Sequence, residues 1–545
     1  MINSFADFNF KKLLNSINWK LLLFLVLFLN VKLAVKIPAI ILIYLLQFNF
    51  RFRFSLKDSR LPLFYLLIIG IAFVGLLVNK NYTNSNYLLL FLTGIVFWGL
   101  CLLAVHQVKL AVENDGVEII HRTILVFFVI NAIISFGNIG LIIWETGSIN
   151  PYTYQGEYQK YFIGTGDYIR GLTFDTSTTN AVLNAFGVVY FLDKKKPVMV
   201  LVCMAILLLT GSNFTNIVLI AVLAILFVFK SSKDQKSIIV ICIMFLVVFM
   251  VKVSPQNNRY VYETVKNAVH PPKITLAVVA AAKPVGPLTS EEIKRKIAQQ
   301  YLDSLRQQID KKSNGVVRPG PLVPKTGNGR ILIAQPNINT PPYQTPTDTT
   351  AEQRQLLTFI DAHKTTLPLS AQNNFIPGTP GKVTSELQTV RFLEKHPIKI
   401  IAGEGIGNFS SKLAFKATGL GFAGGYPTKY IYISKDFLLN HLDVYLNFFS
   451  KRVGLHSLTN SPFSVYDQFL AEYGLLGLAA FVVFYIWFFA RHYKRLTYGL
   501  PLLIIMLAMF SIDYWFEQLS VTVFFELMLF LNIKETTPKL KYAHE

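Results

Sequence analysis

Four polar residues of a long hydrophilic segment are the first candidates for chemistry. They are His441, Lys451, Arg452 and His456. A histidine can accept a proton near neutral pH, whereas lysine and arginine attract anions. Because cysteine and carboxylate ligands are missing at metal-binding spacing, the sequence gives little support for a metal site. A histidine hydrogen-bonded at a surface or an interface is an equally consistent interpretation.

Glu472 stands near the start of the apolar run that follows, six residues after Tyr466. An ionisable residue that enters a membrane helix is costly and is usually paired, which makes it a functional candidate. The alternative is a carboxylate that the helix dipole favours near the N-terminus. Gly474 and Gly477 are small enough for close contact between helices.

A glycine cluster precedes these residues: Gly403-Glu-Gly405-Ile-Gly407-Asn-Phe409. It follows an apolar stretch, as a dinucleotide-binding loop would. No second strand and no suitably spaced acidic residue support that interpretation. A tight turn that packs its backbone against a helix is the better prediction.

Arg170 lies beside Gly171, where an apolar run begins. A guanidinium in this position can bind phosphate with two parallel hydrogen bonds. The competing interpretation is an anchor whose charged end reaches the lipid headgroups.

The elements that must position these residues are membrane helices. The chain is 52% hydrophobic and 15% charged, whereas a soluble domain has about 25% charged residues. About a dozen apolar runs are candidates for crossing a bilayer, and some of them are short for a full span. They lie near 19–31, 37–49, 61–78, 86–106, 123–143, 179–192, 197–210, 213–229, 237–252, 466–489, 499–512 and 518–532.

The distribution of charge predicts the topology. Lysine and arginine gather in alternate loops, for example Lys194 to Lys196 and Arg491 to Arg495. By the positive-inside rule, these loops and both termini are cytoplasmic. The prediction is an all-α integral membrane protein with about 12 transmembrane helices.

Three regions follow from this assignment. Residues 1–252 hold the first nine spans with an outer loop at 146–178, residues 253–463 form a large periplasmic segment, and residues 464–545 hold the last three spans and a cytoplasmic tail. Within the large segment we expect helices near 290–312 and 384–396. The proline-rich tract 313–350 is expected to be extended or disordered.

The order of these elements resembles the O-antigen ligase and O-antigen polymerase family of bacterial membrane glycosyltransferases. The resemblance rests on the glycine cluster, on Tyr466 to Gly477, and on the Arg170-Gly-Leu-Thr-Phe174 stretch. It implies a GT-C-like bundle in a bacterial inner (plasma) membrane, which transfers glycan from an undecaprenyl-pyrophosphate carrier at the periplasmic face. The acceptor would be another glycan, lipid A core or a protein.

The resemblance also suggests roles for individual residues. Cations near the leaving pyrophosphate stabilise its charge, and we assign Arg170, Lys451 and Arg452 to this role. The acceptor hydroxyl needs a base, for which His456 is the first candidate and Glu472 the second. Membrane lipids are expected partners, whereas no metal, other cofactor or nucleic acid is expected.

Other functions stay open. A transporter or flippase for lipid-linked glycans is the main rival class. Transporters usually place polar residues in broken helices at mid-membrane, and here such residues are few, Asn131 and Glu526 among them. A protein O-oligosaccharyltransferase and a membrane protein with a binding ectodomain are further alternatives.

Overall fold

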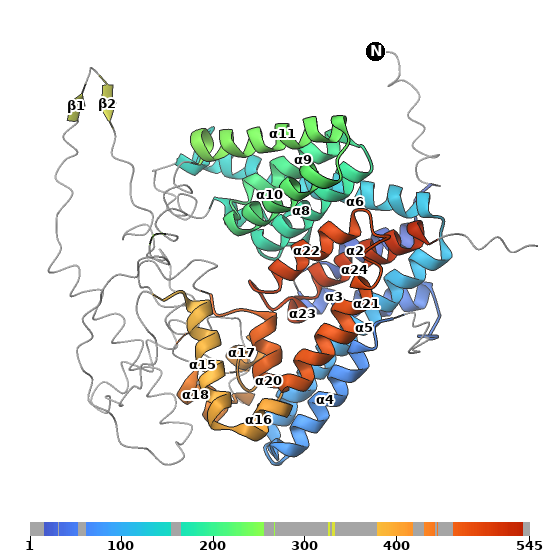
Figure 1. Cartoon of the computed structure of the whole chain (residues 1–545), viewed down its shortest axis with the longest axis vertical. Coiled ribbons are helices and arrows are strands. Elements are labelled where there is room, and N and C mark those ends of the chain that lie inside the picture. Colours follow the sequence, from blue (N-terminus) through green and yellow to red (C-terminus); the bar gives the residue numbers. More distant parts are fainter. Residues whose placement is uncertain are drawn as a thin grey trace, which may run out of the picture.

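The computed structural model describes residues 16–30, 32–52, 61–153, 165–254, 379–417, 430–441 and 461–537, together with residues 266 and 444 and two short strands. Helices dominate these residues (Figure 1). The N-terminal set consists of α2 (Trp19–Phe28), α3 (Leu33–Leu46), α4 (Phe64–Val78), α5 (Ser85–Asn114), α6 (Val117–Thr146), α8 (Ser177–Asp193), α9 (Pro197–Leu209), α10 (Asn213–Phe229) and α11 (Lys233–Val248).

The C-terminal set begins after the long hydrophilic segment. It consists of α15 (Gly381–Lys395), α16 (Pro397–Ala402), α17 (Lys412–Ala417), α18 (Lys435–Asn440), α20 (Val465–Phe481), α21 (Trp487–Ala490), α22 (Gly499–Met509), α23 (Trp515–Gln518) and α24 (Ser520–Thr536). Strands β1 (Lys325–Gly327) and β2 (Arg330–Leu332) pair antiparallel inside the proline-rich tract. The helix expected at 290–312 lies outside the described residues.

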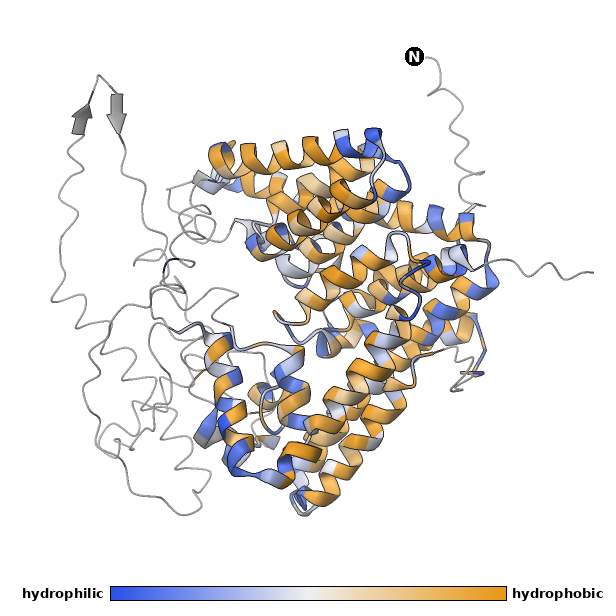
Figure 2. Cartoon of the chain, in the orientation of Figure 1, coloured by the Kyte–Doolittle hydropathy of each residue, from blue (hydrophilic) through white to orange (hydrophobic). Residues whose placement is uncertain are grey.

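The helices have the length and composition of a membrane protein. Within the described residues, four helices are long and apolar enough to cross a bilayer: α5, α6, Lys233–Val253 and Val465–Ala490. Shorter apolar helices accompany them, including α2, α3, α4, α9, α10 and α22. Figure 2 shows that α4, α5 and α11 are mostly hydrophobic, whereas α15 carries hydrophilic residues along its length. The number of spans and the side of the membrane on which each end lies stay predictions.

Local sequence explains where several of these helices begin. Ser232 caps α11 together with Gln235 in a reciprocal capping box. Ser464 caps α20 by accepting a hydrogen bond from the Asp467 backbone N–H at 3.4 Å. Proline occupies the start of α16, where its missing N–H costs nothing.

An aromatic core joins helices that are far apart in the sequence. Phe64 of α4 packs with Trp98 of α5, Phe469 and Phe481 of α20, and Phe516 of α23, with ring centroids 5.5–5.8 Å apart. Such ring pairs add about 0.5–1.5 kcal/mol each beyond the area that they bury. This core fixes α20 and α23 against the N-terminal helices.

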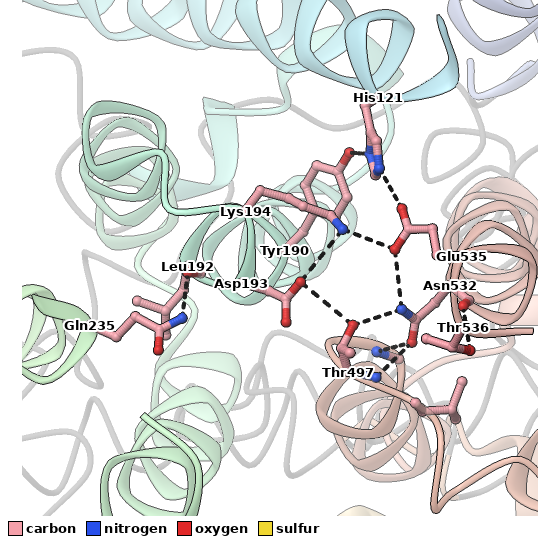
Figure 3. Close-up of polar contacts among 12 residues, drawn as sticks. His121, Tyr190, Leu192, Asp193, Lys194, Gln235, Thr497, Asn532, Glu535 and Thr536 are labelled. Atoms are coloured by element: carbon pink, nitrogen blue, oxygen red, sulfur yellow. Dashed lines mark hydrogen bonds and ion pairs between the residues drawn. The ribbon is translucent and has the colours of Figure 1, made fainter. Parts of the chain in front are cut away.

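A polar network ties the C-terminal end of α24 to α6, α8 and the start of α22 (Figure 3). The Glu535 carboxylate contacts the His121 ring and accepts a hydrogen bond from Lys194 Nζ at 2.9 Å. Asn532 Nδ2 donates to Thr497 Oγ1 at 2.8 Å. Since α24 spans 17 residues, this network lies about 25 Å along the helix axis from the N-terminal end of α24.

Candidate functional site

The glycine cluster packs against a break in α20. Gly474 has φ 66° and ψ −165°, so the helix is interrupted there. The break deprives the Ala471 and Glu472 carbonyls of their usual partners in the next turn. They accept instead from the Glu404 N–H at 2.8 Å and from the Gly405 N–H at 3.0 Å. This matters because an unpaired backbone group in an apolar environment costs several kcal/mol.

The Glu472 side chain completes the contact. Its Oε2 accepts from the Gly407 N–H at 2.8 Å, and its Oε1 accepts from the Phe409 N–H at 3.0 Å. The side chain is buried. We call the cluster and this part of α20, residues 403–409 and 471–474, the glycine clamp. Its hydrogen bonds give Glu472 a structural role, while a role as proton acceptor stays a prediction.

Two positions in the clamp require glycine. Gly403 (φ 72°, ψ −178°) and Gly474 both occupy a backbone region that is essentially restricted to glycine. A Cβ on Gly403 would lie 2.3 Å from the Glu472 carbonyl carbon. A Cβ on Gly474 would lie 2.4 Å from the Ile401 oxygen. Close backbone approach, which the sequence predicted for these glycines, is what they provide.

His441 belongs to a buried polar group behind the clamp. Its Nε2 lies 3.2 Å from Ser385 Oγ, and Ser385 Oγ donates to Asp467 Oδ2 at 2.6 Å. The single serine proton therefore goes to the aspartate, and the imidazole acts as the donor to the serine. A histidine that activates a serine must accept its proton instead. Burial also lowers the pKa of His441 to about 3, which keeps the ring neutral.

A group of charged and polar side chains lies where α17 approaches α23 and the start of α8. We call it the junction cluster, and it consists of Asp175, Lys412, Lys416, Gln468, Asp513 and Glu517.

The two lysines stand one helical turn apart on α17 and are partly buried. Burial lowers the pKa of Lys416, and the like charge of Lys412 lowers it further, while Glu517 and Asp175 act in the opposite direction.

The acidic side chains of the junction cluster differ in environment. Asp513 accepts from the Tyr514 N–H and from Gln518 Nε2, both at 2.7 Å. Burial raises the pKa of Asp175, and Lys412 opposes that shift. Glu517 accepts from Gln468 Nε2 at 2.7 Å. Burial raises its pKa to about 8, the nearby Glu472 carboxylate adds to the rise, and Lys412 and Lys416 oppose it.

Arg170 lies on a turn that buried asparagines hold in place. Asn131 Oδ1 accepts from the Leu172 N–H at 2.9 Å, and Asn180 Nδ2 donates to the Ile169 carbonyl at 3.0 Å. The guanidinium itself is exposed, donates to the Asp167 carbonyl at 3.2 Å and lies over the Tyr168 ring. None of these contacts joins Arg170 to the glycine clamp, although Asp175, five residues further on, reaches the junction cluster.

The other predicted site residues divide into two groups. Lys451, Arg452 and His456 lie outside the described residues. Tyr466 donates its hydroxyl to the Leu507 carbonyl at 2.8 Å and so joins α20 to α22. A Cβ on Gly477 would lie 2.2 Å from Tyr473 Cβ, within the helix just after the break.

Sequence reasoning missed Lys412, Lys416 and Glu517. The two lysines, spaced i and i+4 just after the glycine cluster, were a signal that could have identified them. Glu517 carried a weaker signal, as an acidic residue between the last two apolar runs. Its proximity to the lysines depends on contacts across about a hundred residues and cannot be read from spacing.

Comparisons with protein-family models, with curated proteins and with solved structures gave no match to this chain.

Proposed function

We propose that this protein is a membrane glycosyltransferase that transfers or polymerises glycan from a lipid-pyrophosphate carrier, of the O-antigen ligase or polymerase type. The observation that carries the proposal is the junction cluster. Lys412 and Lys416 are paired on one helix and held partly buried against Asp175 and Glu517. The glycine cluster 403–409, which carries part of the resemblance to this family, lies directly before α17 in the chain.

The chemistry of the reaction fits such a cluster. When the acceptor oxygen bonds to the anomeric carbon, the bond from that carbon to the phosphate oxygen breaks, and the pyrophosphate takes the electron pair. Fixed cations near the developing charge stabilise this transition state. A bound diphosphate would offset the repulsion between Lys412 and Lys416, so its presence would stabilise the charged form of both side chains. Arg170, Lys451 and Arg452 remain candidates for the rest of the diphosphate site.

Gene deletion followed by gel analysis of surface polysaccharide tests the proposal. Products with a single repeat unit indicate a polymerase, whereas bare lipid core with long chains left on the carrier indicates a ligase. Loss of glycan from proteins indicates an oligosaccharyltransferase. Unchanged surface glycans and glycoproteins would refute the proposal, as would carrier-linked glycan that accumulates on the cytoplasmic leaflet, because that is the result of losing a flippase.

Complementation then tests the cluster. Plasmids that encode Lys412→Met or Lys416→Met are expected to restore little polysaccharide in the deletion strain. The control is Lys395→Met, since Lys395 is exposed on α15. Full complementation by the Lys412 and Lys416 variants would remove these residues from the diphosphate site.

A further inference from the structure

Glu517 differs from the other carboxylates around the glycine clamp and the junction cluster. Glu472, Asp513 and Asp175 are buried, whereas Glu517 is partly exposed. Two hydrogen bonds to backbone amides occupy the Glu472 carboxylate, and two donors occupy that of Asp513. The Glu517 carboxylate also receives two hydrogen bonds, from Gln468 Nε2 and from the Leu413 N–H. Its partial exposure is therefore what distinguishes it among the acids of the junction cluster that the structure describes.

The surroundings of Glu517 hold its carboxylate in place. Gln468 Nε2 donates to its Oε1 at 2.7 Å. Gln468 stands one turn before Glu472 on α20, and the glycine clamp fixes that turn. Phe516, next to Glu517 in the chain, packs in the aromatic core against Phe64. The carboxylate thus lies on a rigid support, which general-base catalysis requires.

Glu517 also lies beside the cations assigned to the leaving group. Lys412 and Lys416 both interact electrostatically with it, and the Leu413 backbone N–H between them hydrogen-bonds to it. A base and a diphosphate site that share one cluster can act on the same bound sugar. A base is most effective when its pKa lies near the working pH, and burial moves that of Glu517 to about 8.

On the basis of the proposed function, we infer that Glu517 is the general base that accepts the proton of the acceptor hydroxyl during glycosyl transfer. The O–H bond of the acceptor breaks as its oxygen bonds to the anomeric carbon. The proton moves to the Glu517 carboxylate, and the pyrophosphate leaves with the electron pair of the bond that breaks. This assignment replaces Glu472, whose side chain is buried within the clamp, as the carboxylate that carries the proton.

The test uses the full-length protein in detergent or nanodiscs, with an undecaprenyl-pyrophosphate-linked glycan as donor and a second carrier-linked glycan or lipid A core as acceptor. Glu517→Gln is expected to lower kcat about 100-fold or more, with the donor KM nearly unchanged. In the wild type, kcat should rise with pH as the base loses its proton. In Glu517→Gln this pH dependence should disappear, and in Glu517→Asp it should persist with a shifted midpoint. Glu394→Gln, an exposed acid on α15, is the matched control.

The outcomes separate the two proposals. A wild-type protein that transfers glycan, together with a folded Glu517→Gln variant of equal rate and unchanged pH profile, would overturn the assignment of the base alone. A wild-type protein that transfers no glycan to either acceptor would overturn both. If Glu517→Gln does not fold, the pH profile of Glu517→Asp decides, because an unshifted midpoint excludes Glu517 as the titrating group.

Discussion

Replacing Gly474 with alanine tests the contact between α16 and the break in α20. The backbone region that Gly474 occupies costs about 1–3 kcal/mol for other residues. In addition, the new Cβ would lie 2.4 Å from the Ile401 oxygen, so α16 must move away. That movement weakens the hydrogen bonds from Glu404 and Gly405 to α20, each worth about 0.5–1.5 kcal/mol. The expected loss in free energy of unfolding is therefore about 2–6 kcal/mol.

The measurement is unfolding by SDS titration in mixed micelles. Gly137→Ala is the matched control, because Gly137 lies within α6 and a Cβ there meets no atom within 4 Å. Alanine at that position should be neutral or stabilise α6 by up to about 1 kcal/mol. Gly403→Ala should lower the free energy of unfolding by an amount similar to that for Gly474→Ala. The double variant should lose less free energy of unfolding than the sum of the two single variants, since both glycines lie at the same contact. Equal stability of Gly474→Ala and Gly137→Ala would refute the reasoning.

Three further predictions concern buried polar groups. Glu472→Gln replaces one acceptor oxygen by a donor, leaves a clamp N–H unpaired and should cost about 1.5–3 kcal/mol in the same titration, whereas Glu394→Gln should cost nothing measurable. His441 has a lowered pKa in the folded protein, so at this residue the unfolded chain binds more protons. As pH drops below about 6.5, the wild type should therefore lose stability relative to His441→Gln, and an unchanged difference between the two would show that His441 does not titrate on unfolding. Asn131→Leu leaves the Leu172 N–H unpaired and should speed trypsin cleavage after Arg170, and an unchanged cleavage rate would show that Asn131 does not hold this turn.

Much of the helical framework follows from the sequence. The helix expected near 384–396 is α15, Gly381–Lys395, and it ends before Pro397 because proline disfavours helical geometry in the residue before it. The two short apolar runs near the N-terminus form the separate helices α2 and α3. α5 and α6 run well past their apolar runs at 86–106 and 123–143, since helical hydrogen bonding continues into the polar residues beside an apolar run.

The candidate site was less predictable. The apolar run at 466–489 gave no sign of a break, because hydropathy does not report the sign of φ. The combination of Glu472 with Gly474 was the available clue: an acid in an apolar helix needs donors, and a glycine lets them approach. The junction cluster was beyond such reasoning, since Asp175, Lys412 and Glu517 meet only after α8, α17 and α23 have packed.

The buried polar residues also bear on the rival transporter function. Asn131 binds the turn that carries Arg170, and the Glu526 carboxylate accepts hydrogen bonds from Tyr65 and, at 2.7 Å, from Tyr485. Both residues therefore bind protein groups that fix one arrangement of the helices. A transporter must break such contacts as it alternates between two arrangements. The charged groups of the junction cluster belong to this same packed bundle, which suits the proposed glycosyl transfer better than alternation between two arrangements.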